Sequence, residues 1–162
     1  MTSNTVSPLL LSYFQKQQTP AGWFDLLSIM IDNMVMNVGE TESLLFLRQM
    51  GEAFAERFPL PESTTIGELE TNINARLEDF NWGYIDINAS EERITFHHQA
   101  FPLSRDEHSQ MRWCHAFCAI LEGVYSRWLR EQGGKLHVTF SHERQHSLSN
   151  VVFYYAATPT MS

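Results

Sequence analysis

The sequence has few cysteines and lacks any long apolar run. Its 162 residues include two cysteines, Cys114 and Cys118, which lie one helical turn apart and cannot cross-link distant segments. No apolar stretch approaches the roughly 20 residues that span a bilayer. The N-terminus also lacks the basic start and apolar core of a signal peptide. These absences predict a soluble, cytoplasmic protein without membrane insertion.

Positive charge is also scarce. Eleven Lys and Arg residues stand against nineteen Asp and Glu residues, which gives a formal net charge of −8 at pH 7. A surplus of negative charge repels phosphate backbones and anionic lipid headgroups. The sequence therefore disfavours binding to nucleic acid and to membrane surfaces.

The common catalytic motifs are missing as well. The sequence contains no glycine-rich phosphate loop, no G-x-S-x-G elbow and no C-x-x-C pair. Its paired carboxylates, Glu91-Glu92 and Asp106-Glu107, fall at a predicted turn and a predicted helix start, where acidic residues have structural roles. We expect no enzymatic activity and no cofactor.

Three groups of residues permit a metal hypothesis, but each has a simpler interpretation. Cys114, His115 and Cys118 lack the second ligand pair of a structural zinc site, so the cysteines fit better as a buried reduced pair. Residues 142–146 match H-E-x-x-H by letter, but that signature requires a helix and here follows a predicted strand. His97-His98 alternates to opposite faces of a strand and cannot easily chelate one ion. We therefore expect no metal site.

The length suits one domain with a terminal extension. Residues 1–20 have the composition of a mobile N-terminal segment, in which residues 9–17 could form a short helix. Residues 21–158 contain every longer regular pattern without a linker-like interruption. We predict a single domain over residues 21–158.

The first half of this domain has helical periodicity. Apolar residues recur every three or four positions in three segments. Gly39 ends the first segment and Pro59 ends the second, whereas Thr65 and Glu68 match a capping box at the start of the third. The predicted helices cover residues 23–38, 44–58 and 65–80.

A longer central helix is predicted over residues 104–131. Ser104 and Glu107 match a capping box at its start, and Gly133-Gly134 supplies a stop. Gly123 lies on its apolar stripe, where a missing side chain lets a neighbouring backbone approach, so we interpret it as a packing contact. The stripe itself consists of Trp113, Phe117, Ile120, Leu121, Val124 and Trp128.

The remaining patterns predict strands. Residues 84–88 and 93–97 alternate around a short turn and predict a hairpin, and residues 136–140 and 151–155 predict two more strands after the central helix. We therefore predict an α+β fold in which N-terminal helices precede a four-stranded antiparallel sheet of two hairpins, separated by the long central helix.

The last predicted strand indicates self-association. Residues 151–155 are apolar or aromatic on both faces, and a lone domain of this length rarely hides both faces of a strand near its end. We expect an oligomer interface that includes Val152, Phe153, Tyr154 and Tyr155. Four tryptophans and five tyrosines exceed the needs of a core, which favours an interface or a carbohydrate surface.

Two stretches carry a family resemblance. Residues 80–87, FNWGYIDI, and residues 121–128, LEGVYSRW, resemble the two signature stretches of the D subunit of bacterial cellulose synthase. The order and spacing of the elements between them also resemble that family. The resemblance spans about residues 40–157, while the first 20 residues and the strand at 150–155 match only in character.

The resemblance implies a non-catalytic accessory subunit, whose dimers assemble into a homo-octameric ring. It implies passages for nascent β-1,4-glucan chains and a role, with other cellulose synthase operon proteins, in ordering the inner-membrane synthase complexes for export of crystalline cellulose. In that family the N-terminal segment lies at the passages. From their chemistry alone, we expect the glucan contacts to be Tyr13, Phe14, Gln15, Lys16 and Gln17.

A second resemblance leaves an alternative function open. The order of hairpin, glycine-containing helix and hairpin is similar to that of the small-molecule-binding domains named after vinyl reductase. Those domains typically place cysteines in their last strands, whereas Cys114 and Cys118 lie on the predicted central helix. The alternative is therefore a small-molecule-binding regulatory domain.

Overall fold

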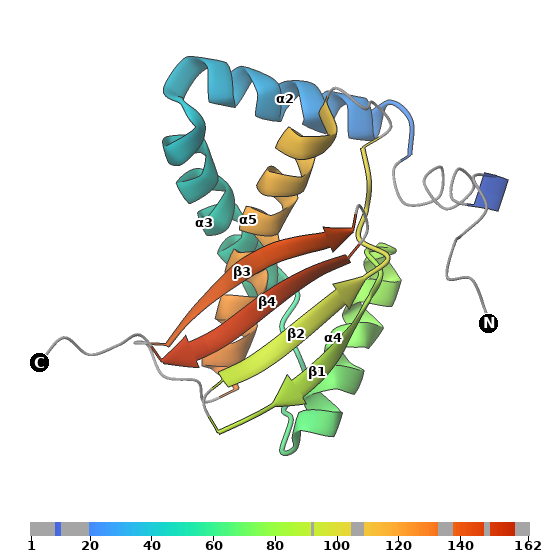
Figure 1. Cartoon of the computed structure of the whole chain (residues 1–162), viewed down its shortest axis with the longest axis vertical. Helices are drawn as coiled ribbons and strands as arrows, with labels where there is room; N and C mark the ends of the chain where they lie inside the picture. Colours follow the sequence, from blue (N-terminus) through green and yellow to red (C-terminus); the bar gives the residue numbers. More distant parts are fainter. Residues whose placement is uncertain are drawn as a thin grey trace, which may run out of the picture.

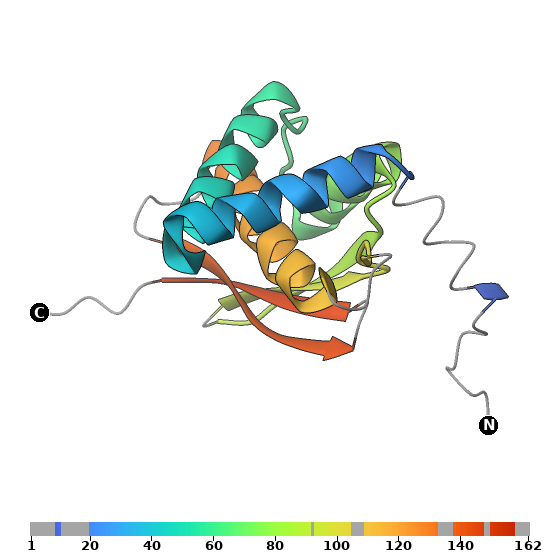
Figure 2. The ribbon, with the colours of Figure 1, turned by 90° about the horizontal axis from the view of Figure 1, so that it is seen from above.

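The computed structural model describes residues 9–10, 20–91, 93–104, 109–132, 138–147 and 150–157, without the side chains of residues 138–147 and 155–157. Helices gather on one face of an antiparallel sheet (Figures 1 and 2). The predicted α+β class is confirmed. Among the described helices, none combines the length and the apolar character that crossing a bilayer requires.

The first two long helices meet at a single residue. α2 (Trp23–Val38) has the predicted bounds, and α3 (Glu40–Arg57) begins directly after Gly39, earlier than the expected start at residue 44. Gly39 has φ 87° and ψ 166°, a conformation that is essentially restricted to glycine. The chain therefore turns sharply there, and α3 descends from one end of α2 (Figure 1).

α4 (Ile66–Phe80) begins at the predicted cap. The Thr65 hydroxyl accepts a hydrogen bond from the Glu68 amide at 3.1 Å. The Glu68 carboxylate accepts from the amide and the hydroxyl of Thr64, both at 2.8 Å, rather than from the Thr65 amide of a standard capping box. These bonds, the Thr64 amide first, favour the charged carboxylate and lower the pKa of Glu68.

The sheet has the strand order β1-β2-β4-β3 with antiparallel pairing throughout. Because β4 lies between β2 and β3, its backbone is paired on both sides. Residues 142–146 lie on β3, so the H-E-x-x-H letters occupy a strand instead of the helix that a zincin needs. The strands are β1 (Tyr84–Ala89), β2 (Arg93–Gln99), β3 (Val138–Ser147) and β4 (Asn150–Ala157).

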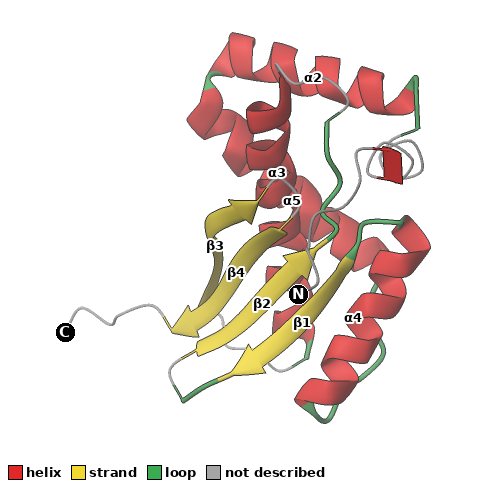
Figure 3. Cartoon of the chain, turned by 45° about the vertical axis from the view of Figure 1, so that its right-hand side comes forward, coloured by secondary structure: helices red, strands yellow, loops and turns green. Residues whose placement is uncertain are grey.

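α4 lies along the edge strand β1 (Figure 3). Side chains of α4 form hydrogen bonds with backbone groups of this strand. The Asn74 amide accepts from the Ile85 N–H at 2.7 Å and donates to the Ile85 carbonyl at 3.0 Å. The Glu70 carboxylate accepts from the Ile87 N–H at 2.9 Å. An open strand edge can pair with another chain, and these side chains block that pairing along β1.

α5 (Gln110–Glu131) packs between α3 and the sheet. It begins at Gln110 instead of Ser104, because the Ser104 amide donates to the Gln110 side chain at 2.7 Å and Trp113 Nε1 donates to the Pro102 carbonyl at 2.9 Å. The predicted partners of the start and stop, Glu107 and Gly133-Gly134, lie outside the described residues. The buried stripe of α5 forms the centre of the core.

Candidate interaction surface

α2 carries a large exposed apolar surface. Of its residues, only Phe24 and Ile31 are buried. Trp23 is 75% exposed and Met36 is 77% exposed. The other apolar residues of α2 that are half or more exposed are Leu26, Leu27, Ile29, Met30 and Val38. The stripe from which we predicted the helix is therefore mostly open to solvent in the single chain.

One flank of α2 holds the helix to the body of the protein. The Phe24 ring packs edge-on against Trp113 of α5, with 4.7 Å between centroids. Asp32 forms an ion pair of 3.1 Å with Arg112 of α5. Since successive residues rotate by about 100°, Leu26 and Met30 lie together on a different flank from Phe24.

α3 adds further exposed apolar residues. Phe46 and Met50 are one turn apart, and both are exposed, as is Leu45. The opposite flank of α3 is buried, through Leu47, Gly51 and Ala55. We call the exposed apolar residues of the two helices the α2–α3 surface.

A hollow of about 380 Å³ lies between α2, α3 and α5. Its lining includes the buried residues Ile31, Leu47 and Ala116, and its polar residues include Glu40 and His115. His115 Nδ1 lies 3.5 Å from Glu40 Oε1. The hollow is thus lined by both apolar and polar side chains.

Two glycines allow α3 and α5 to pack closely. A Cβ built on Gly51 would lie 1.9 Å from the Ile120 carbonyl oxygen, and one built on Gly123 would lie 2.0 Å from that of Arg48. Contacts this short leave no room for a side chain at either position. The prediction that Gly123 is a packing contact is confirmed, and Gly51 is its counterpart on α3.

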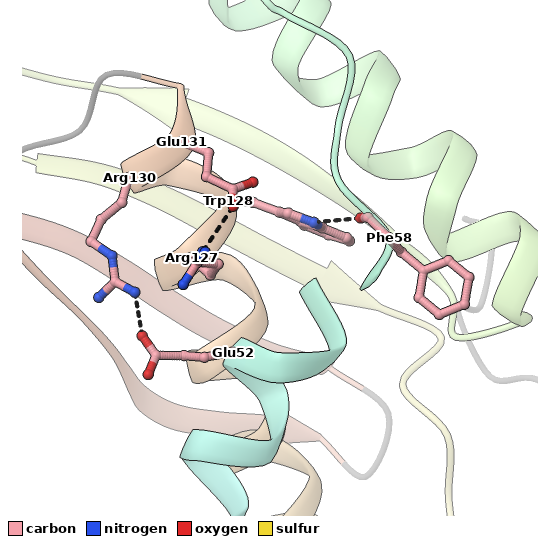
Figure 4. Close-up of polar contacts among 6 residues, drawn as sticks. All are labelled: Glu52, Phe58, Arg127, Trp128, Arg130 and Glu131. Carbon is pink, nitrogen blue, oxygen red and sulfur yellow. Dashed lines mark hydrogen bonds and ion pairs between the residues drawn. The ribbon is translucent and has the colours of Figure 1, made fainter. Parts of the chain in front are cut away.

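Polar contacts clamp the same helix pair (Figure 4). Arg130 of α5 forms an ion pair with Glu52 of α3 at 2.5 Å, and Arg48 pairs with Glu122 at 2.8 Å. The indole of Trp128 donates to the carbonyl of Phe58, at the end of α3, across 2.9 Å. These contacts hold α3 against α5 and thereby determine the position of the α2–α3 surface on the protein.

A buried polar network ties the sheet to α5. His98 Nε2 lies 2.7 Å from the Trp82 carbonyl, which can only accept, so Nε2 donates; the Tyr125 hydroxyl donates to Nδ1 at 2.6 Å. Burial, the main cause, lowers the pKa of His98 to about 4, and also raises the pKa of Tyr125. The histidine is therefore a neutral structural group at neutral pH.

The two signature stretches contribute residues to the core. Trp82 packs on Phe54 and Phe117, at 5.0 and 5.1 Å between ring centroids. Tyr125 packs on Phe153 of β4 at 5.3 Å. Three of the four tryptophans are therefore used inside the subunit, and Trp23 is the exception.

The predicted interface residues lie on both faces of β4. Phe153 is fully buried against α5, whereas Val152 and Tyr154 alternate to the opposite face of the sheet. The Tyr155 side chain and the predicted glucan contacts, Tyr13, Phe14, Gln15, Lys16 and Gln17, lie outside the described residues. We did not predict the exposure of α2, because its apolar period indicates a helix without showing what covers the apolar flank.

Within the described residues, no cluster of three or more His, Cys, Asp or Glu side chains could hold a metal ion. Cys114 and Cys118 are buried and do not form a disulfide. The hydrogen bond with Cys114, followed by burial, raises the pKa of Cys118. The thiolate, which is the metal-binding form of cysteine, is therefore disfavoured there.

Comparisons with known proteins give the family. Residues 9–156 match the family described as the D subunit of cellulose synthase. Two proteins named cellulose synthase operon protein D, from Komagataeibacter xylinus and Komagataeibacter sucrofermentans, are each 34% identical over 91 residues, which is 54% of this chain and 56% of theirs. These matches thus span about half the length of the relatives. Another K. xylinus protein of that name is 27% identical over 128 residues, or 76% of this chain and 78% of its own. The chain belongs to the family of the cellulose synthase D subunit.

Proposed function

We propose that the chain is a non-catalytic accessory subunit of bacterial cellulose synthesis that assembles with copies of itself into a ring. The ring would order the synthase complexes at the inner membrane from the cytoplasmic side, together with other proteins of the operon. Family membership supports the role in cellulose synthesis. The observation that carries the assembly is the exposed α2–α3 surface.

The α2–α3 surface has the chemistry of a permanent interface. Exposed apolar area of this extent marks interaction surfaces in soluble proteins. Fully burying a side chain such as Leu26 or Met30 contributes about 1.5–3 kcal/mol, so several of them together would offset the entropy lost on association. A second copy of the chain supplies the same apolar surface and is therefore the matching partner.

Assembly through helices also agrees with the fact that the backbone of the edge strand β1 already has hydrogen-bond partners. Side chains of α4 already bond the backbone of β1 at Ile85 and Ile87. Pairing of two sheets through β1 would require those bonds to break. Packing through the α2–α3 surface would leave those bonds intact.

The proposed ring would also bring N-terminal segments together. The expected glucan contacts at residues 13–17 precede α2 by a few residues, and each residue spans at most about 3.6 Å. Assembly through α2 would thus collect these segments from several subunits within a short distance of one interface. Shallow stacking on Tyr13 and Phe14, with exchangeable hydrogen bonds, would let a glucan chain slide through an octamer.

The hollow between α2, α3 and α5 supports a second candidate, a small-molecule-binding regulatory domain. Its volume of about 380 Å³ falls within the range of ligand pockets. Mass spectrometry of the purified protein under native conditions separates the two candidates. A stoichiometric small ligand would favour the pocket function, and a ligand-free oligomer would favour the assembly.

Deletion of the gene in its native host tests the proposed function. We expect less cellulose or less crystalline cellulose, and a disturbed arrangement of synthase complexes. Restoring a chain that lacks residues 1–18 should rescue assembly but not full cellulose order. Unchanged cellulose amount, order and synthase arrangement in the deletion strain would reject the proposal.

A further inference from the structure

One face of the sheet is uncovered by the described helices. α2, α3, α4 and α5 all lie on the other side (Figure 2). Ile85 and Ile87 of β1 are buried towards the helices, while Tyr84 and Asp86 are exposed on the open side. The register places Gln99 opposite Tyr84, and Tyr154 opposite Thr95. We call this open side the outer sheet face.

The side chains of the outer sheet face form an ordered polar and aromatic layer. The Tyr84 hydroxyl donates to Gln99 Oε1 at 3.1 Å, and Gln99 Nε2 donates to Asp86 Oδ2 at 2.7 Å. Arg93 Cζ lies 4.0 Å from the centroid of the Tyr154 ring, which is the geometry of a cation–π contact. Arg93 therefore covers Tyr154, whereas Tyr84 is 48% exposed.

We propose that the outer sheet face binds a β-1,4-glucan chain, with Tyr84 as its stacking ring. A pyranose ring presents apolar C–H groups on its faces and hydroxyls at its rim. An exposed aromatic ring can stack on the apolar C–H face. The Asp86 carboxylate and the Gln99 amide can form hydrogen bonds with the sugar hydroxyls. A glucan in its extended form can lie along a sheet face that the described helices leave uncovered.

Charge and composition favour a neutral polymer over the other occupants. The protein has a net charge of −8, yet Asp86 and Arg93 on this face carry opposite charges. A polyanion would be repelled by the whole chain. A second copy of the chain would bury Asp86, Arg93 and the neighbouring polar groups, and interface cores are depleted of charged residues.

The inference rests on the proposed function, because that role brings the protein to nascent glucan. It differs from the N-terminal contacts in the segment that it uses: Tyr84 lies on the edge strand β1, beside α4 (Figure 3), whereas the N-terminal contacts are expected at residues 13–17, before α2. The two sites can therefore be separated by substitution.

Titration of the full-length protein with cellohexaose, followed by calorimetry, tests the inference. We expect weak binding in the millimolar range and binding of the protein to amorphous cellulose. Tyr84→Ala should weaken binding about fivefold, as expected from loss of one stacking contact. Tyr84→Phe keeps the ring and should stay within about twofold of the unchanged protein. Since Tyr84 is exposed, both variants should keep the unfolding midpoint.

Ile66→Ala is the control, because it removes an exposed apolar side chain on α4, outside both the outer sheet face and the α2–α3 surface. It should bind cellohexaose as the unchanged protein does. Equal affinity of the unchanged protein and Tyr84→Ala, loss of binding in Ile66→Ala alone, or no binding of cellohexaose would each overturn the inference. The cellulose phenotype of the gene deletion is independent of these results, so failure here is distinguishable from failure of the proposed function.

Discussion

Gly123 of α5 lies directly against the carbonyl oxygen of Arg48 on α3, at a distance that excludes any side chain at position 123. Gly51 repeats the relationship in the opposite direction, against Ile120. The backbones of the two helices therefore touch. This contact, with the ion pairs of Arg48 and Arg130 beside it, fixes the frame on which the α2–α3 surface is displayed.

Gly123→Ala should destabilise the protein by about 1–3 kcal/mol, because the added methyl group forces the helices apart. Urea denaturation measures the change. Gly67→Ala is the control, since Gly67 is exposed near the start of α4 and a Cβ there would lie 3.9 Å from the Thr65 hydroxyl oxygen. The control should be neutral or stabilise by up to about 1 kcal/mol through helix propensity. Equal losses in the two variants would contradict close packing of α3 on α5.

Trp128→Phe should lower the free energy of unfolding more than loss of the ion pair between Arg130 and Glu52. Trp128 is fully buried, and removing its indole N–H leaves the Phe58 carbonyl without that donor, at a cost of about 1–3 kcal/mol. Arg130→Met removes the partner of Glu52, and a pair that is partly exposed is worth about 1 kcal/mol or less. Thermal and urea unfolding of both variants measure this order. The reverse order would show that the ion pair, and not the indole, fixes the end of α3.

Stability should fall as the pH drops below the ordinary pKa of histidine. The pKa of His98 is lowered from 6.5 to about 4 in the folded chain, first by burial, so the unfolded chain binds a proton more readily. Above pH 6.5 the protonation of His98 does not change the free energy of unfolding. Between pH 6.5 and 4 it removes up to about 3 kcal/mol of unfolding free energy.

Urea denaturation from pH 7.5 to 4.5 measures this dependence. His98→Gln should be less stable at neutral pH but should lose less stability on acidification than the unchanged protein. His97→Gln, at the neighbouring position on the other face of the strand, should change the slope much less, because the charge of His97 is the smallest of the causes that act on the pKa of His98. Identical pH slopes in the unchanged protein and His98→Gln would rule out His98 as the cause.

Local sequence patterns were sufficient for most elements of the fold. Gly39 and the helical period fixed the bounds of α2, and the cap at Thr65 fixed the start of α4, because both depend on neighbours in sequence. The predicted start of α5 at Ser104 was wrong, because the Ser104 amide donates to the side chain of Gln110 instead. That bond depends on tertiary structure and not on the local pattern. The contact of His98 with Tyr125 depends on strand register and could not be predicted.

The candidate site was harder to predict than the fold. Apolar periodicity shows which flank of a helix avoids water, but it cannot show whether the cover comes from the same chain or from another copy. The period that includes Leu26 and Met30 therefore predicted a helix but no interface, and the interface that we predicted on β4 stays a prediction. The surroundings of Tyr84 could not be predicted either, because its hydrogen-bond partner Gln99 lies on β2 and depends on the register between β1 and β2.

Self-association should depend on one flank of α2. A Leu26→Glu and Met30→Glu double variant places two carboxylates one turn apart on the α2–α3 surface. Burying them unpaired would cost several kcal/mol, so association should weaken by at least about 100-fold. Light scattering measures the mass of the assembly, and circular dichroism should show unchanged helix content, because both residues are exposed in the subunit. Ile66→Asp, an exposed apolar residue at the start of α4, should leave the assembly intact.

The central claim is that this family member acts in cellulose synthesis as an assembly held through α2. Its most direct test is cellulose crystallinity, measured by X-ray diffraction, in a gene-deletion host that carries either the unchanged chain, the Leu26→Glu and Met30→Glu variant or Ile66→Asp at equal protein levels. We predict that the unchanged chain and Ile66→Asp restore crystallinity and that the double variant does not. Full restoration by a double variant that is monomeric in solution would contradict the claim.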